Sequence, residues 1–201
     1  MKVFAKRFIC GLGVLGCLLL GGCYVQSIHP FFVESAVVEE PGLLGEWVVV
    51  EQFGDELAEG EDTRFVFGEG ELMVVMRHID QACRVEEEFE ATLFKVGGEL
   101  MLDLYPEEGG SPYFNFHVYP VHGLVKVILS GDSLTLLPLD ADEFWGKVEE
   151  EEIHLPYVAS EGGGGLVTAT SDEWMRFLEG YVKDERVYDQ ESSMILARVL
   201  P

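Results

Sequence analysis

The stretch from Val85 to Leu104, VEEEFEATLFKVGGELMLDL, determines the expected class of fold. In its first half, Phe89, Ala91 and Leu93 alternate with polar residues, which places apolar side chains on one face of a β-strand. Gly97-Gly98 then marks a tight turn, and a second alternating run follows it. The stretch therefore predicts two antiparallel strands joined by a short hairpin.

Similar runs, separated by short turn signals, lie on both sides of this hairpin. Most of the turns are too short for a crossover helix, so neighbouring strands are expected to be antiparallel. We expect a mainly β fold of about eight strands, arranged as an antiparallel barrel or half-barrel. The further candidate strands are residues 44–53, 64–67, 72–79, 113–121, 124–129 and 134–139, with short late strands at 166–169 and 194–199.

Two short helices are expected in the last third of the chain. Residues 140–152 carry Phe144 and Trp145 at a spacing that is typical of an apolar helix face. A second helix begins at a capping box, in which Thr170 is the N-cap and Glu173 reaches back to it. The apolar stripe that follows consists of Trp174, Phe177, Leu178 and Tyr181.

The N-terminus has the pattern of a bacterial lipoprotein signal. Three basic residues precede the apolar stretch 8–20, and a lipobox, Leu20-Gly21-Gly22-Cys23, follows directly. We expect cleavage after Gly22 and a diacylglyceryl group on Cys23. The alternative is an uncleaved signal anchor over residues 8–25, because this stretch is close to the length that spans a bilayer.

The predicted processing divides the chain into three parts: a signal peptide at 1–22, an acylated tether at 23–41 and a single β domain at 42–201. Within the tether, the apolar residues Phe31 and Phe32 can still dock on the domain. The formal net charge is -24, and the loss of three basic residues makes it -27. Such a charge excludes nucleic acid as a partner and repels anionic lipid headgroups. We expect a protein of the bacterial envelope that meets the membrane through its lipid, in the outer membrane if the host has one.

The four cysteines leave no pair for a disulfide in the processed chain. Cys10 and Cys17 are removed with the signal peptide, and Cys23 carries the lipid. The remaining thiol, Cys83, is followed closely by acidic residues, which disfavour a thiolate. We therefore expect Cys83 to be an inert thiol and the domain to fold without disulfides.

Four motifs, in a fixed order after the lipobox, resemble those of a group of uncharacterised bacterial lipoproteins. The resemblance covers nearly the whole processed chain. It implies a lipid-anchored envelope protein and supplies no catalytic residue, because that group has no established activity. The motifs are Leu43-Leu44-Gly45-Glu46-Trp47, the stretch 97–106, Pro120-Val121-His122, and Leu166-Val167-Thr168-Ala169-Thr170.

Gly45-Glu46-Trp47 also resembles the G-x-W signature in the first strand of lipocalins. This resemblance implies a lipocalin-like barrel in which Trp47 closes one end and an arginine from a late strand packs on it. Arg198 is the candidate for that arginine, through a cation–π contact of about 1 kcal/mol. The two helices inside the sequence depart from the lipocalin pattern, since a lipocalin usually has one helix after all eight strands.

Two patterns suggest chemistry but have simpler explanations. His117, His122 and Asp103 could hold a metal only if a turn brought them together, and no metal-binding spacing is present. Gly131-Asp132-Ser133-Leu134 spells a motif of hydrolases, but Asp and Gly at this place are explained by a hairpin turn. The sequence therefore predicts no catalytic residue, no metal and no cofactor apart from the covalent lipid.

Several aromatic residues lie on the predicted strands, and they have two interpretations. They either fill the interior of the barrel or line a pocket for an apolar ligand, because an eight-stranded barrel can do either. The favoured function is a non-enzymatic binding or envelope-structural module, and the alternative is a carrier of a small apolar molecule. An envelope protein is the other possible partner. The residues concerned are Trp47, Phe65, Phe67, Phe89 and Phe94.

Overall fold

The computed structural model describes residues 24–52, 54–56, 63–69, 74–80, 85–106, 120–161 and 163–200. The predicted signal peptide with Gly22, the predicted lipidation site Cys23, the thiol of Cys83 and His117 lie outside these described residues. The predicted strand at 113–121 also falls almost entirely outside them. No helix in the described part of the chain has the length and apolar character that crossing a membrane requires.

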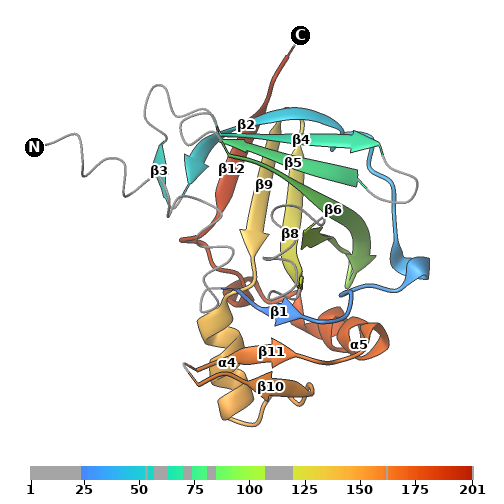
Figure 1. Cartoon of the computed structure of the whole chain (residues 1–201), viewed down its shortest axis with the longest axis vertical. Coiled ribbons are helices and arrows are strands. Elements are labelled where there is room, and N and C mark those ends of the chain that lie inside the picture. The colour runs from blue at the N-terminus through green and yellow to red at the C-terminus, as the bar shows by residue number, and fades with distance from the viewer. Residues whose placement is uncertain are drawn as a thin grey trace, which may run out of the picture.

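Eight antiparallel strands form the main body of the sheet (Figure 1). Going from one strand to its hydrogen-bonded neighbour, their order is β2, β4, β5, β6, β7, β8, β9 and β12. Because β12 also pairs with β2, the pairings form a ring, called here the strand ring. The bounds are β2 Gly45–Gln52, β4 Thr63–Glu69, β5 Val74–Asp80, β6 Val85–Val96, β7 Glu99–Pro106, β8 His122–Ser130, β9 Ser133–Pro138 and β12 Met194–Arg198.

Three short strands continue the sheet beyond the N-terminal end of β8. Strand β1 (Gln26–Ser27) pairs with the first residues of β8, which β9 does not reach. Strand β11 (Gly165–Val167) pairs with β1, and β10 (Tyr157–Ala159) pairs with β11. The β1–β11 pair is parallel, so the expectation of a purely antiparallel sheet is wrong at this point. The two strands come from chain segments far apart in sequence, so no hairpin turn fixes their relative direction. A further two-residue strand, β3 (Asp55–Glu56), pairs with β2.

Both predicted helices are present, at the same end of the molecule as β1, β10 and β11 (Figure 1). Helix α4 (Ala141–Glu149) starts at Asp140, whose side chain accepts the Glu143 N–H at 2.9 Å. It ends earlier than the predicted residue 152, and Glu151 then has a positive φ of 59°, a left-handed conformation common after helix ends. Helix α5 (Ser171–Tyr181) has the capping box that the sequence predicts. Short 3-10 turns are η2 (Glu34–Ala36) and η3 (Glu185–Val187).

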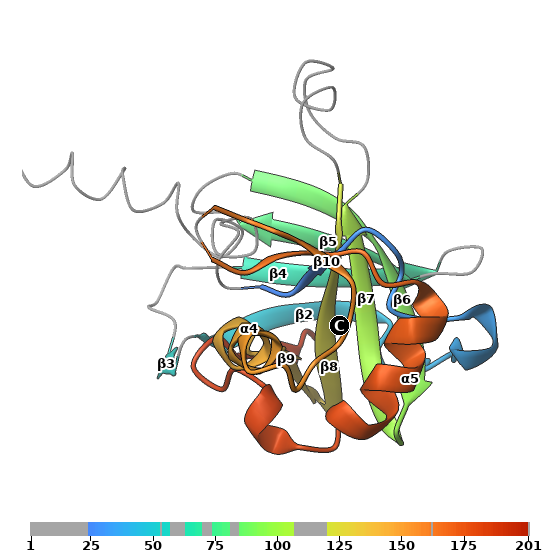
Figure 2. The same ribbon diagram turned by 90° about the horizontal axis from the view of Figure 1, so that it is seen from below.

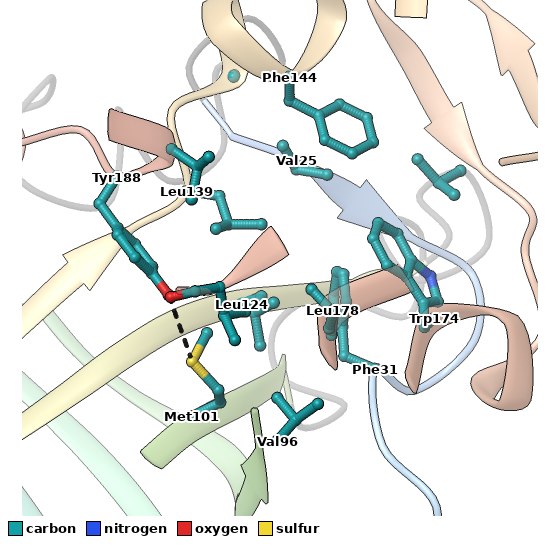
Figure 3. Close-up of a cluster of buried hydrophobic side chains, with 14 of the residues drawn as sticks. Val25, Phe31, Val96, Met101, Leu124, Leu139, Phe144, Trp174, Leu178 and Tyr188 are labelled. Atoms are coloured by element: carbon teal, nitrogen blue, oxygen red, sulfur yellow. Dashed lines mark hydrogen bonds between the residues drawn. The ribbon is translucent and has the colours of Figure 1, made fainter. Parts of the chain in front are cut away.

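The apolar side chains form two clusters, one on each face of the sheet. The strand core lies on the inner face of the strand ring and includes Trp47, Phe65 and Leu102. The helix-side core lies between the outer face and helices α4 and α5, where Trp174 and Phe31 pack 4.5 Å apart between ring centroids. Strand alternation separates the two sets. Figure 2 shows α4 and α5 on either side of β8 and β9, and Figure 3 shows the helix-side core.

Residues 24–41, which the sequence predicts as a tether, are packed into the fold instead. Tyr24 is 8% exposed, Val25 is 2% exposed and Phe31 is fully buried. The prediction is wrong here because a strand of two residues shows no periodicity, and its burial depends on partners more than 90 residues away. The mainly β fold with two helices is confirmed. It is not a simple barrel, because β1, β11 and β10 extend the sheet beyond the ring.

Candidate functional site

At one end of the strand core, Trp47 and Arg198 lie opposite each other on β2 and β12. The Arg198 guanidinium carbon is 4.1 Å from the centroid of the Trp47 ring, as expected for a cation–π pair. The indole N–H donates to the carbonyl of Leu43 at 2.8 Å. Arg198 donates through Nη1 to the carbonyl of Leu44 at 2.8 Å and through Nη2 to that of Gly42. The arginine thus ties the segment before β2 to the last strand.

The glycine of the G-x-W motif has two structural reasons to be glycine. Gly45 has a φ of +120°, which L-amino acids with a side chain rarely adopt. A Cβ at this position would also lie 3.1 Å from Nη1 of Arg198. The motif therefore places the Trp47 ring and the Arg198 guanidinium in contact through backbone geometry.

The predicted pocket residues lie together in the strand core, with one exception. Trp47 is fully buried and pairs with Phe65 on β4, while Phe67 is the pairing partner of Gly45. Phe65 and Phe67 are each 2% exposed, and Phe89 of β6 is 8% exposed in the same cluster. Phe94 instead lies in the helix-side core, because odd and even positions of β6 face opposite sides of the sheet.

The opposite end of the strand core holds Tyr24, which sequence analysis did not single out. Its ring lies directly on Gly123 of β8, where an added Cβ would come well under 3.0 Å from Cε1 of the tyrosine. The phenolic oxygen is buried and has no hydrogen-bond partner among the described residues. Burial raises the pKa of Tyr24, and the nearby negative charge of Asp103 raises it further. In the sequence, the one sign of this contact is the glycine at position 123. A glycine indicates a close approach, but it does not indicate which residue approaches it.

Asp103 and His122 form a hydrogen-bonded pair on the outer face of β7 and β8. Oδ1 of Asp103 is 2.7 Å from Nδ1 of His122, and Oδ2 accepts the backbone N–H of Phe31 at 2.9 Å. Asp103 is 2% exposed, and the His122 ring lies 4.5 Å from that of Tyr105. A carboxylate on Nδ1 orients an imidazole for proton transfer at Nε2, as in catalytic triads. Here the second carboxylate oxygen also fixes the N-terminal segment onto the sheet.

The sequence offers Asp103, His117 and His122 as possible ligands of a metal ion. Of these three residues, the structure brings together Asp103 and His122, while His117 lies outside the described residues. Among the residues that are described, no group of three or more His, Cys, Asp or Glu side chains could hold a metal ion.

The hydrolase-like string occupies the turn between β8 and β9. Gly131 has a φ of +61°, which suits a tight hairpin. The carbonyl of Asp132 accepts the backbone N–H of Arg198 at 2.9 Å, and its carboxylate lies 3.5 Å from Nε of the same residue. Ser133 begins β9 and pairs with Ser130. The string therefore supports the Trp47–Arg198 end of the fold through Asp132.

A shallow hollow of about 240 Å³ lies on the surface between α4, α5 and η3. Lys147, Tyr181 and Asp184 are among the residues that line it, and the buried hydroxyl of Tyr181 has no partner among the described residues. Lys147 already forms ion pairs with Glu143 at 3.1 Å and Glu152 at 3.6 Å. The hollow therefore has a mixed polar and apolar lining, and the Lys147 ammonium group in it is already paired with carboxylates of the protein.

No protein-family profile, curated protein or solved structure matches this chain. The similarity to bacterial lipoproteins and to lipocalins therefore stays a prediction from the sequence motifs.

Proposed function

We propose that this chain is a lipid-anchored lipoprotein of the bacterial envelope, with a lipocalin-like barrel that acts as a non-enzymatic binding or structural module. The observation that carries the proposal is the position of the lipobox relative to the fold. The lipobox ends at Cys23, and the next residue, Tyr24, is already buried against Gly123. Cleavage after Gly22 would therefore leave every described residue in place and put the lipid at the first residue of a folded domain.

The pairings support the lipocalin-like part of the proposal. Eight strands in a ring, a G-x-W motif in β2 and an arginine over its tryptophan are the features that the resemblance implies. The Asp103 carboxylate has a structural role, because one of its oxygens binds His122 and the other accepts the Phe31 N–H of the N-terminal segment. A buried carboxylate that is fully hydrogen-bonded is a common structural element.

The experiment compares Cys23→Ala with the matched variant Cys17→Ala in the full chain. Both remove a thiol near the N-terminus, but only Cys23 is expected to receive lipid. We expect incorporation of a fatty-acid analogue and recovery in the membrane fraction to be lost in Cys23→Ala alone. Equal labelling of both variants, or of neither, would refute the lipid anchor.

A second candidate, a carrier of a small apolar ligand, is favoured by the aromatic residues of the strand core and by Tyr24. A buried hydroxyl without a partner is unfavourable by about 1–3 kcal/mol, and the headgroup of a bound ligand could supply the missing acceptor. Native mass spectrometry of the purified protein, with extraction of bound lipid, tests this function. A retained apolar adduct that is lost on Phe67→Ala would support a carrier, and a clean mass after lipid addition would exclude it.

A further inference from the structure

The lipidation site that we propose lies one residue from the core of the domain. Consecutive Cα atoms are about 3.8 Å apart, so Cys23 begins within that distance of buried Tyr24. No flexible linker separates them, because the backbone continues from Tyr24 directly into β1, which is paired on both sides. An acyl anchor at Cys23 would hold this end of the molecule against the bilayer surface.

The sheet next to this end has a row of apolar side chains on the face that points away from α4 and α5. In the register of the three short strands, Gln26, Leu166 and Val158 form one row across β1, β11 and β10. Val158 is 63% exposed, and Ile28, two residues after Gln26, is 40% exposed. Ile28 continues the strand by donating its N–H to the carbonyl of Val167 at 3.1 Å.

The alternate row of these strands faces the other way. Ser27 and Val167 are fully buried, and the Ser27 hydroxyl accepts the indole N–H of Trp174 at 2.9 Å. Strand β10 has a single strand neighbour, β11, within the part of the chain that the structure describes. Ile28, Leu166 and Val158 therefore lie on the face of the extension that points away from the helix-side core, with Leu166 half-buried and the other two exposed.

We propose that the face formed by Ile28, Leu166 and Val158 lies in the headgroup region of the membrane leaflet that carries the Cys23 lipid. The proposal rests on the lipid anchor proposed above and adds which face of the domain meets the bilayer. Exposed apolar side chains gain free energy when the interface covers them, and the anchor removes most of the entropy cost of bringing them there. The formal charge of -27 supplies no attraction to anionic lipid, so the contact is apolar and insensitive to salt.

The test places an environment-sensitive fluorophore on one residue of this face and on a matched control. In the full lipoprotein with Cys83→Ser, we would label Val158→Cys, and separately Ile128→Cys, and reconstitute each in phosphatidylcholine vesicles. Ile128 is 43% exposed on β8, five residues beyond Gly123, or about 16 Å along the strand. Ile28→Cys is the second test position in case the label disturbs the edge strand.

We expect blue-shifted emission at Val158→Cys and Ile28→Cys, with several-fold stronger quenching by a lipid-borne nitroxide than at Ile128→Cys. Raising the salt concentration should leave this difference unchanged. Vesicle flotation and the mass of the N-terminal peptide separate the two proposals. Protein that floats and carries lipid but shows equal, aqueous emission at all three positions overturns the membrane-facing surface alone. Protein that neither floats nor carries lipid overturns the anchor, and this proposal with it.

Discussion

The Arg198 guanidinium lies 4.1 Å above the Trp47 ring and at the same time donates to two backbone carbonyls of the segment before β2. This arrangement joins the first long strand of the chain to the last. Because the strand ring is complete only when β12 lies between β2 and β9, the pair contributes to holding the ring together.

Arg198→Ala should therefore destabilise the domain. The variant loses the cation–π contact and leaves two carbonyl groups without their donor, which together cost about 2–3 kcal/mol. Arg198→Lys should recover part of this loss, since it keeps the charge but not the fork of donors. Equilibrium unfolding in guanidinium chloride measures both. Arg186→Ala is the control, because Arg186 is exposed and its ion-pair partner among the described residues is Asp184, so the unfolding midpoint should not move. Equal effects at Arg186 and Arg198 would contradict the role of the pair.

A side chain at position 123 should destabilise the domain, because the Tyr24 ring fills the space that the side chain would occupy. Gly123→Ala would force the tyrosine ring aside, and overpacking of this kind typically costs about 1–3 kcal/mol. In a Tyr24→Ala background the same substitution should cost far less, since the clash is gone. Gly146→Ala in α4 is the matched control. It meets no atom within 4 Å and should stabilise the helix by up to about 1 kcal/mol. An undiminished cost of Gly123→Ala without Tyr24 would be inconsistent with the contact.

Tyr24 should make the domain sensitive to alkaline pH. Its pKa is raised in the folded state above the ordinary value of 10.0, so the folded state keeps a proton that the unfolded chain releases. The free energy of unfolding should therefore be unaffected by this group below about pH 10 and should fall as the pH rises above it. Tyr24→Phe should show a shallower fall, measured by urea unfolding between pH 8 and about 11. A slope unchanged by Tyr24→Phe would mean that Tyr24 is not buried.

Tyr188 supplies the comparison for Tyr24 at neutral pH. Burial also raises the pKa of Tyr188, but its hydroxyl donates to the carbonyl of Val182 at 2.8 Å. Tyr188→Phe should thus cost about 1 kcal/mol at pH 7, whereas Tyr24→Phe should be neutral or stabilising. The same unfolding experiment at pH 7 distinguishes the two positions.

Asp103 should hold the N-terminal segment to the sheet. Asp103→Asn keeps the shape but weakens the charge-assisted bonds to His122 and to the Phe31 N–H, at a cost of about 1.5–3 kcal/mol. Backbone amides of residues 25–31 should then exchange hydrogen faster than in the parent protein, as mass spectrometry would record. Asp132→Asn is the control, because its carboxylate is 70% exposed and lies on the opposite end of β8. Unchanged exchange at residues 25–31 in Asp103→Asn would remove this role.

Local patterns of the sequence predict much of this fold, and the contacts that they miss are all between distant segments. The alternation in 85–104 and the capping box at Thr170 depend on neighbouring residues, and both predictions are confirmed. The approach of Arg198 to Trp47 could be expected only through the resemblance of Gly45-Glu46-Trp47 to a known motif. The burial of Tyr24 has no local signal, because it depends on the missing side chain of Gly123, 99 positions later.

In the candidate site, too, the residue types could be read from the sequence, but the contacts between distant segments could not. The sequence offers Asp103 and His122, together with His117, as possible metal ligands, but without a metal-binding spacing it predicts no metal. The structure pairs Asp103 with His122 across β7 and β8, and the Phe31 N–H takes the remaining carboxylate oxygen. That third partner comes from a segment predicted to be a tether, so the structural role of the carboxylate could not be derived before the segment was placed.

The mass of the intact protein extracted from bacterial membranes is the most direct test of the lipid anchor. We expect a chain that begins at Cys23 and carries the added mass of covalent acyl and glyceryl groups. Digestion should assign the whole addition to the N-terminal peptide. An unmodified chain that still carries residues 1–22, or a processed chain without lipid, would contradict the lipid anchor.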